Sequence, residues 1–451
     1  MKPTVLAALF LTLQAQANPY WDPNAVPQDV QVFGEETKEI GRPVKADGLP
    51  ALRIEIAWTE QGETYSLARI VKENSGTQAL AKRASKADPL GSYHAILKDP
   101  RTRRAVYFDA IGTGKEYRRL TRSLSFRFPM IQSKMILEVY AENPVSGIQE
   151  KVLEAKIDPA RAAKATKLAD QNFEVRVLKG STSSRALRLN VYSDGYTANR
   201  KAEFWTHAQK VVTGLEGNKF PGFEQFEIRA VFLTSNERMP AAKNLGMPVP
   251  ELNTALGLFY PYWDNFGRWF NVVYPTRENK LRTGFGTVGY DYPIVLIDDA
   301  DYWGVGNYKM YTAIPALHGS FTYLLLHELG HFFGLNEEYE GGGRTELEFA
   351  PKMSEPWSQN ITFLRSNEMG KLKWNKYVIQ STKLPTPVGT WNPSKPLYGA
   401  YFGGYADSPA EGTRSHKPGR ACTMERDPRF CPVCQEAIKA EIVKDTGRSK
   451  N

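Results

Sequence analysis

The sequence has few features that would attach the chain to a membrane or to nucleic acid. Beyond an apolar run at residues 5–13, no segment approaches the roughly 18 apolar residues that a membrane-spanning helix needs. No cysteine follows that run closely enough to carry a lipid anchor. The chain is basic, with a formal net charge of +9, but no nucleic-acid-binding motif accompanies the charge. We therefore expect no transmembrane segment and no nucleic-acid partner.

The first residues have the order of an export signal. Lys2 precedes the apolar run at 5–13, and the small-residue pattern AQA follows at 15–17. This order is typical of a secretory signal peptide, here with cleavage before Asn18. We expect residues 1–17 to be that signal peptide and the rest of the chain to be exported, either secreted or periplasmic.

The chain has only six histidines in 451 residues, and two of them lie in one HExxH pattern. Random placement would produce that pattern with a chance of roughly one in 200, so coincidence explains it poorly. His327 and His331 follow an apolar run, which predicts a helix at 316–334. At this spacing both imidazoles lie on one face of the helix, near enough to bind one metal ion. Glu328 can then reach a metal-bound water as a general base, as in zinc peptidases.

A third metal ligand is expected beyond this helix. Gly334 can adopt the left-handed conformation that ends a helix and turns the chain back. Glu337 follows in the order HExxHxxGxxE and can return to the metal. A catalytic zinc takes three protein ligands and keeps one position open. We predict one zinc ion held by His327, His331 and Glu337, with Glu338 as the alternative third ligand.

Alternation of apolar and polar residues predicts strands in the first part of the chain. It occurs at 52–58, 124–128 and 135–141. The stretches before and after these strands are rich in proline and charge, or in alanine and lysine. We predict an extended arm or linker at 18–48, an all-β sandwich domain at 49–158, a linker at 159–171, a catalytic domain at 172–446 and a tail at 447–451.

Strands and helices alternate in the second part of the chain. Strands are predicted at 187–191, 226–233 and 292–297, and helical spacing of apolar residues occurs at 204–215. This α+β order is expected of a zincin, in which a sheet packs on the helix that carries the metal ligands. The strand before that helix is expected to form the rim of the cleft, where a substrate peptide can add by main-chain pairing.

Several sequence blocks occur in a fixed order over residues 172–444. They are SDGYT at 193–197, SNE at 235–237, NTALG at 253–257, YWG at 302–304, HELGHFFGLNEEY at 327–339, PWSQN at 356–360, CTM at 422–424 and FCPVC at 430–434. In this order the blocks resemble the immunoglobulin A-peptidase family of secreted bacterial zinc metalloendopeptidases, which are relatives of the metzincins. The resemblance implies a metzincin-like catalytic domain, a catalytic zinc ion and a protein or peptide substrate.

The chain departs from that family at two places. The family has one more residue between the second histidine and an Asp-Glu pair, whereas here the pair is Glu337-Glu338. The shorter spacing puts Glu337 at the third-ligand position of metzincins. Phe402 stands where the family tends to carry an acid, so no role is transferred from that acid. Metzincins also place a methionine below the zinc, and Met424 is the candidate for this Met-turn.

The expected reaction requires one further kind of site residue. A donor for the oxyanion is expected on the opposite wall of the cleft, and the candidates are Tyr401, Tyr405 and His416.

The three cysteines lie within 13 residues, at Cys422, Cys431 and Cys434. Because an exported chain enters an oxidising space, we expect one disulfide from Cys422 to Cys431 or Cys434, and one free thiol. Such a bond would brace the Met-turn. The alternative is a structural zinc site formed by the three cysteines and His416.

Together these features predict an exported zinc-dependent endopeptidase. One alternative is a non-catalytic, zinc-stabilised envelope-binding protein (an adhesin), against which the intact HExxH argues. The other is a zinc amidase that acts on cell-wall peptides. Residues 98–127 hold nine Lys and Arg against three acids, which suits either an ordinary solvated face or contact with an anionic envelope surface.

Overall fold

The fold is described from a computed structural model of the chain. It describes residues 40–45, 47–59, 63–113, 121–143, 146–164, 173–183, 185–238, 253–259, 262–263, 268–269, 273–275, 278–301, 303–340, 354–405 and 415–447. The predicted signal peptide, most of the predicted arm and most of the tail lie outside these residues. Lys38–Asn451 form one compact unit.

Two four-stranded sheets lie where the β-sandwich was predicted. Their apolar faces share one core, which includes Ile54, Phe126 and Leu137, each 0% exposed. The three strands predicted from alternation are confirmed as β2, β6 and β7. The sheet orders are β6-β2-β3-β9 and β5-β4-β7-β8, with β2 (Leu49–Thr59), β3 (Thr64–Gly76), β4 (Tyr93–Lys98), β5 (Ala105–Ile111), β6 (Ser123–Pro129), β7 (Met135–Glu142), β8 (Gln149–Ile157) and β9 (Ala163–Lys164).

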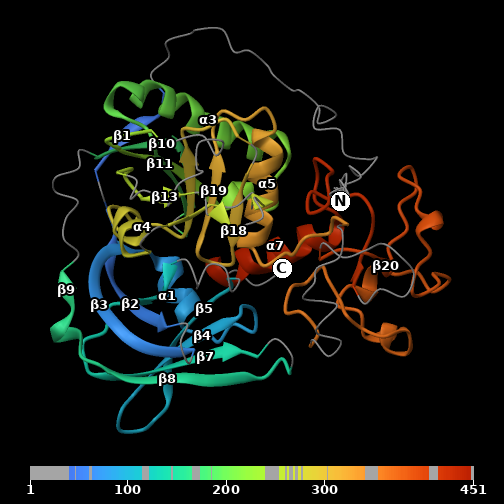
Figure 1. Cartoon of the computed structure of the whole chain (residues 1–451), viewed down its shortest axis with the longest axis horizontal. Coiled ribbons are helices and arrows are strands. Elements are labelled where there is room, and N and C mark those ends of the chain that lie inside the picture. The colour runs from blue at the N-terminus through green and yellow to red at the C-terminus, as the bar shows by residue number, and fades with distance from the viewer. Residues whose placement is uncertain are drawn as a thin grey trace, which may run out of the picture. The chain divides into compact units, whose positions relative to one another are not determined.

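A seven-stranded mixed sheet forms the centre of the second part (Figure 1). The strands β12, β11, β17 and β19 are parallel to one another. The strand β10 pairs antiparallel with β12, and β18 pairs antiparallel with β19 at the far edge. The order is β1-β10-β12-β11-β17-β19-β18, with β1 (Arg42–Val44), β10 (Phe173–Lys179), β11 (Leu187–Asp194), β12 (Phe226–Leu233), β17 (Tyr292–Ile297), β18 (Val305–Asn307) and β19 (Tyr311–Pro315).

Helices cover both faces of this sheet, and each strand alternates between them. Val191 and Ile294 face α3 (Lys201–Gly217), α5 (Phe321–Phe332) and α7 (Pro432–Thr446) in one buried cluster. Their neighbours Tyr192 and Val295 belong to a second cluster with α4 (Glu278–Phe285) and the sandwich core. Because this second cluster is continuous, the sandwich and the sheet bury their apolar surfaces against each other.

The strands predicted at 226–233 and 292–297 are confirmed as β12 and β17, and the helical spacing at 204–215 is confirmed as α3. The rim prediction is wrong for β17, because this strand is buried throughout inside the sheet. The edge beside α5 is formed by β18 instead (Figure 1). The helix also begins at Phe321 and not at 316, since the Ala316 N–H still donates to the Ile297 carbonyl at 2.9 Å.

Two predicted linkers contain short strands. In the arm, β1 pairs with β10 of the central sheet. In the linker at 159–171, β9 pairs with β3 of the sandwich. Segments of two or three residues are too short to show a period in the sequence, so only main-chain pairing reveals them. The predicted domain boundaries stay predictions.

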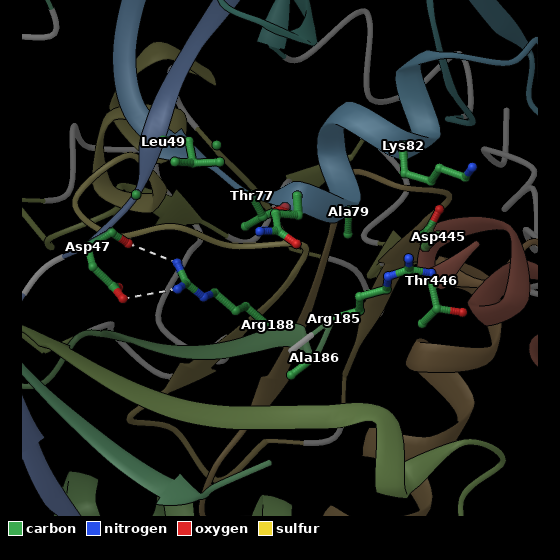
Figure 2. A pocket seen from close by; sticks show the side chains of 13 residues that line it. Asp47, Leu49, Thr77, Ala79, Lys82, Arg185, Ala186, Arg188, Asp445 and Thr446 are labelled. Atoms are coloured by element: carbon green, nitrogen blue, oxygen red, sulfur yellow. Dashed lines mark hydrogen bonds and ion pairs between the residues drawn. The ribbon is translucent and has the colours of Figure 1, made fainter. Parts of the chain in front are cut away.

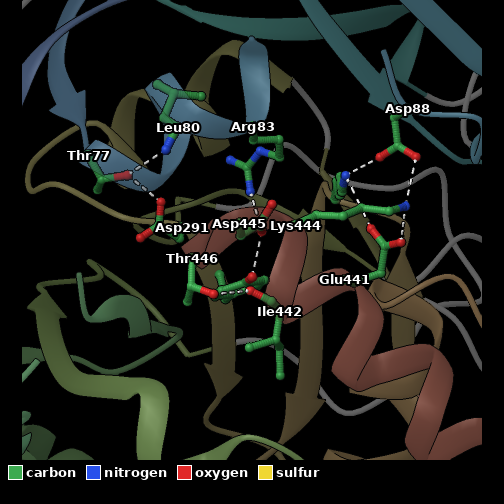
Figure 3. Close-up of polar contacts among 12 residues, drawn as sticks. Thr77, Leu80, Arg83, Asp88, Asp291, Glu441, Ile442, Lys444, Asp445 and Thr446 are labelled. Carbon is green, nitrogen blue, oxygen red and sulfur yellow. Dashed lines mark hydrogen bonds and ion pairs between the residues drawn. The ribbon is translucent and has the colours of Figure 1, made fainter. Parts of the chain in front are cut away.

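Charged side chains join the sandwich to the last helix (Figure 3). The short helix α1 (Gln78–Ala84) begins at Thr77, whose Oγ1 accepts the Leu80 N–H at 3.0 Å. At its other end, Arg83 donates to Asp445 of α7 at 3.1 Å, and these two side chains are only 11% and 1% exposed. A buried ion pair of this kind fixes the position of α1 on α7 because either charge alone would be poorly solvated.

We expect Asp445→Ala to lower the free energy of unfolding by about 3–5 kcal/mol, because it leaves the Arg83 charge unpaired in a mostly buried place. Urea denaturation followed by circular dichroism measures this effect. The control is Glu154→Ala, which removes the exposed partner of Arg103 and should leave the urea midpoint almost unchanged. Equal shifts for the two variants would contradict the assigned role of the buried pair.

Among the residues that the structure describes, no helix has both the length and the apolar character needed to cross a bilayer.

Candidate metal centre

The helix α5 brings the two imidazoles of the HExxH pattern together. The ring centroids of His327 and His331 lie 4.9 Å apart, with the rings nearly perpendicular at 89°. His327 Nδ1 lies 3.0 Å from the Thr423 carbonyl oxygen, and His331 Nδ1 lies 2.9 Å from the Leu335 carbonyl oxygen. A carbonyl can only accept, so each Nδ1 carries the proton and each Nε2 keeps its lone pair. Both rings are therefore in the tautomer that binds a metal ion through Nε2.

The surroundings of His327 keep its ring uncharged. Burial lowers the pKa of His327 to about 4, and the neighbouring His331 acts in the same direction. The Tyr339 ring stacks on His327 with centroids 6.1 Å apart, and the Tyr323 hydroxyl lies 3.4 Å from His327 Nδ1. Tyr323 was missed in the sequence analysis, although its position one turn before His327 on the same helix is a usable signal.

Glu328 is buried between α5 and the edge of the sheet. Its carboxylate fills the space that a side chain at Gly304 would take, because a Cβ there would collide with Glu328 Oε1. Gly306 in β18 is equally constrained, since a Cβ there would collide with the Glu328 carbonyl oxygen. Burial raises the pKa of Glu328 to about 8, and the charge of Glu337 adds to this shift. The Gly306 backbone N–H acts in the opposite direction by donating to the carboxylate.

The two neighbouring acids after the helix have different surroundings. The chain turns at Gly334, whose φ is +85°. The charge of Glu337 acts on both His327 and Glu328, raising the pKa of each. The carboxylate of Glu338 is fully buried elsewhere, where its Oε1 accepts from Asn360 Nδ2 and from Cys434 Sγ, each at 2.9 Å. Glu337 is thus the acid associated electrostatically with His327 and Glu328.

Met424 packs directly against the helix that carries the histidines. It is 0% exposed, and a Cβ added to Gly330 would collide with its sulfur. The Met424 carbonyl accepts the Glu338 N–H at 2.7 Å. The methionine therefore lies below the turn of α5 that separates the two histidines, where the sequence analysis expects the Met-turn.

The three oxyanion candidates have other contacts. The Tyr401 hydroxyl donates to the Leu397 carbonyl at 2.8 Å. The Tyr405 ring packs edge-on against Phe363, with centroids 5.5 Å apart, and its N–H donates to the Glu337 carbonyl. His416 is buried, and its ring lies 4.8 Å from that of Phe402. Their predicted role stays a prediction, and the Tyr405 N–H contacts the main chain of the predicted ligand Glu337.

The cysteines form a group with Glu338. Cys422, Cys431 and Cys434 are buried free cysteines in the structure. Their sulfur atoms and a Glu338 carboxylate oxygen all lie within 4.8 Å of one another, close enough to hold a metal ion. The fourth residue of this group is Glu338, in place of the predicted His416. The disulfide from Cys422 stays a prediction.

The structure also contains a pocket of about 530 Å³ (Figure 2). It is lined by the start of α1, the start of β11 and the end of α7, and includes Lys82, Arg188 and Asp445. The Arg188 guanidinium in this pocket donates two hydrogen bonds to Asp47, one to the carboxylate at 3.0 Å and one to the main-chain carbonyl at 2.9 Å. None of its described lining residues belongs to the HExxH segment, so the donor groups, and not this pocket, define the candidate site.

The comparison with known protein families identifies part of the chain. Residues 175–396 match the family described as IgA Peptidase M64. This region is an M64-family peptidase. The match includes α5, Glu337 and Glu338, and it ends before Met424 and the cysteines. No curated protein matches the chain.

Membership of the M64 family implies a metallopeptidase and confirms the resemblance drawn from the sequence blocks. It also favours the peptidase over the adhesin, because the family is one of enzymes.

A substitution of Gly330 tests the close packing of α5 on Met424. Gly330→Ala should lower the free energy of unfolding by about 1–3 kcal/mol, because the added methyl group forces the Met424 sulfur aside. The matched control is Gly214→Ala in α3, where an added Cβ meets only ordinary contacts at 3.4 Å or more. That variant should stabilise the helix by up to about 1 kcal/mol. Thermal unfolding of both variants gives the comparison, and destabilisation by Gly214→Ala alone would contradict it.

Proposed function

We propose that the chain is an exported zinc-dependent endopeptidase with a zincin-like catalytic domain. The observation that carries the proposal is the pair of imidazoles whose Nδ1 protons are both donated to main-chain carbonyls. This arrangement fits a zinc ion, which is bound through the Nε2 atoms of two histidines and through an acidic oxygen. His327, His331 and Glu337 would hold the ion, and the bonds of Glu338 to Asn360 and Cys434 favour Glu337 over the alternative Glu338.

Zinc, when bound, polarises the scissile carbonyl and lowers the pKa of water to about 7. Glu328 supplies the proton transfer. Its carboxylate takes the proton of the attacking water and then delivers it to the nitrogen of the leaving amine. Glu328 is 7% exposed beside Gly304, which keeps bulk solvent away from this carboxylate during the two proton transfers.

The sheet edge beside the site supports an extended peptide as the substrate. The strand β18 pairs antiparallel with β19 on one side and is the last strand of the described sheet. A substrate segment that adds to β18 would pass directly over α5, because Gly306 is in contact with the main chain of Glu328. Main-chain pairing gives affinity without demanding particular side chains. A mixed sheet with an antiparallel edge strand beside the metal-site helix also supports the zincin assignment.

Export is proposed from the signal-like order of the first 17 residues, which puts the enzyme outside the cytoplasm. The proposed substrates are therefore proteins or peptides of the envelope or the surroundings. A peptide-library digest with products identified by mass, with and without a chelator, tests the activity. Digestion of purified peptidoglycan in parallel tests the amidase alternative, and cleavage of peptidoglycan but of no library peptide would contradict an endopeptidase.

Replacing the proposed base separates catalysis from metal binding. Glu328→Gln should reduce kcat by about 10²–10⁴-fold while zinc stays bound, because the amide keeps the shape of the carboxylate but accepts no proton. Zinc content by mass spectrometry and hydrolysis of a library-derived peptide measure the two effects. Glu203→Gln in α3, which removes a partner of Arg200, is the control and should behave like the parent protein. Full activity of Glu328→Gln would discard the assignment of the base.

Replacing the proposed third ligand tests the choice between the two acids. Glu337→Gln should weaken zinc binding at the histidines by more than the 10–100-fold that is typical of residues outside the ligand set. Competition with a chromophoric chelator measures the dissociation constant. If Glu337→Gln keeps the parental affinity, Glu337 is not a ligand.

A further inference from the structure

A second cluster of metal-binding side chains lies next to the proposed catalytic centre. It consists of Cys422, Cys431, Cys434 and Glu338, whose ligand atoms are mutually within 4.8 Å. The exposed fractions of these residues are 0%, 3%, 0% and 0%. Three sulfur atoms and one oxygen make four donors, the number that a tetrahedral zinc site needs when it keeps no position for water.

The carboxylate of Glu338 gives an independent indication of a missing cation. Its Oε2 is buried and has no hydrogen-bond partner among the described residues. The Lys417 ammonium donates to the Glu338 main-chain oxygen at 2.6 Å and to Glu425 Oε1 at 2.7 Å. A buried carboxylate oxygen without a partner is costly, so native proteins rarely retain one unless it has a ligand or another role.

The main chain around the cysteines also favours bound thiolates. Cys431 caps the first turn of α7, Pro432 follows, and Cys434 lies in that same turn. The free N–H groups and the dipole at the start of a helix stabilise negative sulfur. The Cys431 N–H also donates to Cys422 Sγ at 3.3 Å. The first turn of α7 thus holds two sulfur atoms and orients the third.

We propose that Cys422, Cys431, Cys434 and Glu338 form a second, structural metal site that binds one zinc ion. This site is separate from the histidine site and goes beyond the proposed function. With four protein donors it has no open position, so it stabilises and does not react. A disulfide between two of the cysteines would leave the Glu338 Oε2 without a partner, whereas a metal ion satisfies all four residues.

The ion would connect three segments that surround the catalytic centre. Glu338 adjoins the proposed ligand Glu337, Cys422 lies two residues before Met424, and the other two cysteines begin α7. The metal site therefore positions the third ligand and the Met-turn without touching the substrate.

Metal counting on the full-length, exported protein is the first test. We expect about two zinc ions per chain in the parent protein and about one in the double variant His327→Ala/His331→Ala. After replacement of zinc by cobalt, that double variant should keep a sulfur-to-cobalt charge-transfer band, because the thiolates remain. A single ion that disappears in the double variant, with no such band in the parent, would overturn the second site while leaving the proposed peptidase intact. Loss of the band in Cys431→Ser, with the histidine ion retained, supports the second site.

The adjacent pair Glu337 and Glu338 provides matched variants. Glu338→Gln should alter the charge-transfer band and weaken binding of the second ion, whereas Glu337→Gln should affect only the histidine-bound ion. If the cysteine variants do not fold, a mercurial reagent added to the folded parent protein decides the question. Modification of the three thiols should release about one zinc ion to a chromophoric chelator. An intact mass lower by two hydrogens would show a disulfide and overturn the proposal.

Discussion

The close approach of α5 to its neighbours is the constraint on which the site depends. Gly304 and Gly306 bring the sheet edge against the helix on one side, and Gly330 admits the sulfur of Met424 on the other. Held between these surfaces, the helix presents its imidazoles to two fixed carbonyls, and these fix the tautomer of each ring. The same packing removes Glu328 from water and raises its pKa. The orientation of the imidazoles and the raised pKa of Glu328 therefore have one cause. Gly304, Gly306 and Gly330 have no side chain, so α5 can pack this closely against its neighbours.

The last helix connects this centre to the rest of the molecule. Its first turn carries Cys431 and Cys434, beside the Met-turn and Glu338. Its last turn carries Asp445, which holds α1 of the sandwich through Arg83 (Figure 3). The sandwich core is also continuous with the apolar cluster under the sheet. The amino-terminal strands are therefore part of the support of the region around α5, and a disturbance at either end of α7 can reach the proposed metal ligands through rigid packing.

The sequence predicted the long, periodic elements well and the short ones poorly. The segments β12, β17 and α3 agree with the predictions because six or more residues with one clear period identify their structure. The edge strand β18 has three residues, and β1 has three within a stretch that resembles a linker. Such strands are stabilised by pairing with a neighbour that is distant in sequence, so no local sequence pattern predicts them. The rim was assigned to the wrong strand for this reason.

The sequence by itself determined the chemistry that depends on neighbours along the chain. One turn of helix separates His327 from His331, and Gly334 turns the chain back, so the two proposed ligands and the proposed base follow from spacing alone. Only the tertiary structure showed that the side chains of Glu337 and Glu338 lie in different surroundings, because adjacent residues of a chain can point in different directions. It also brought Glu338, and not His416, to the cysteines, and committed the Tyr401 hydroxyl to a carbonyl. These outcomes depend on contacts between segments tens of residues apart, whose geometry is set by packing and by burial of polar groups, and no local spacing encodes it.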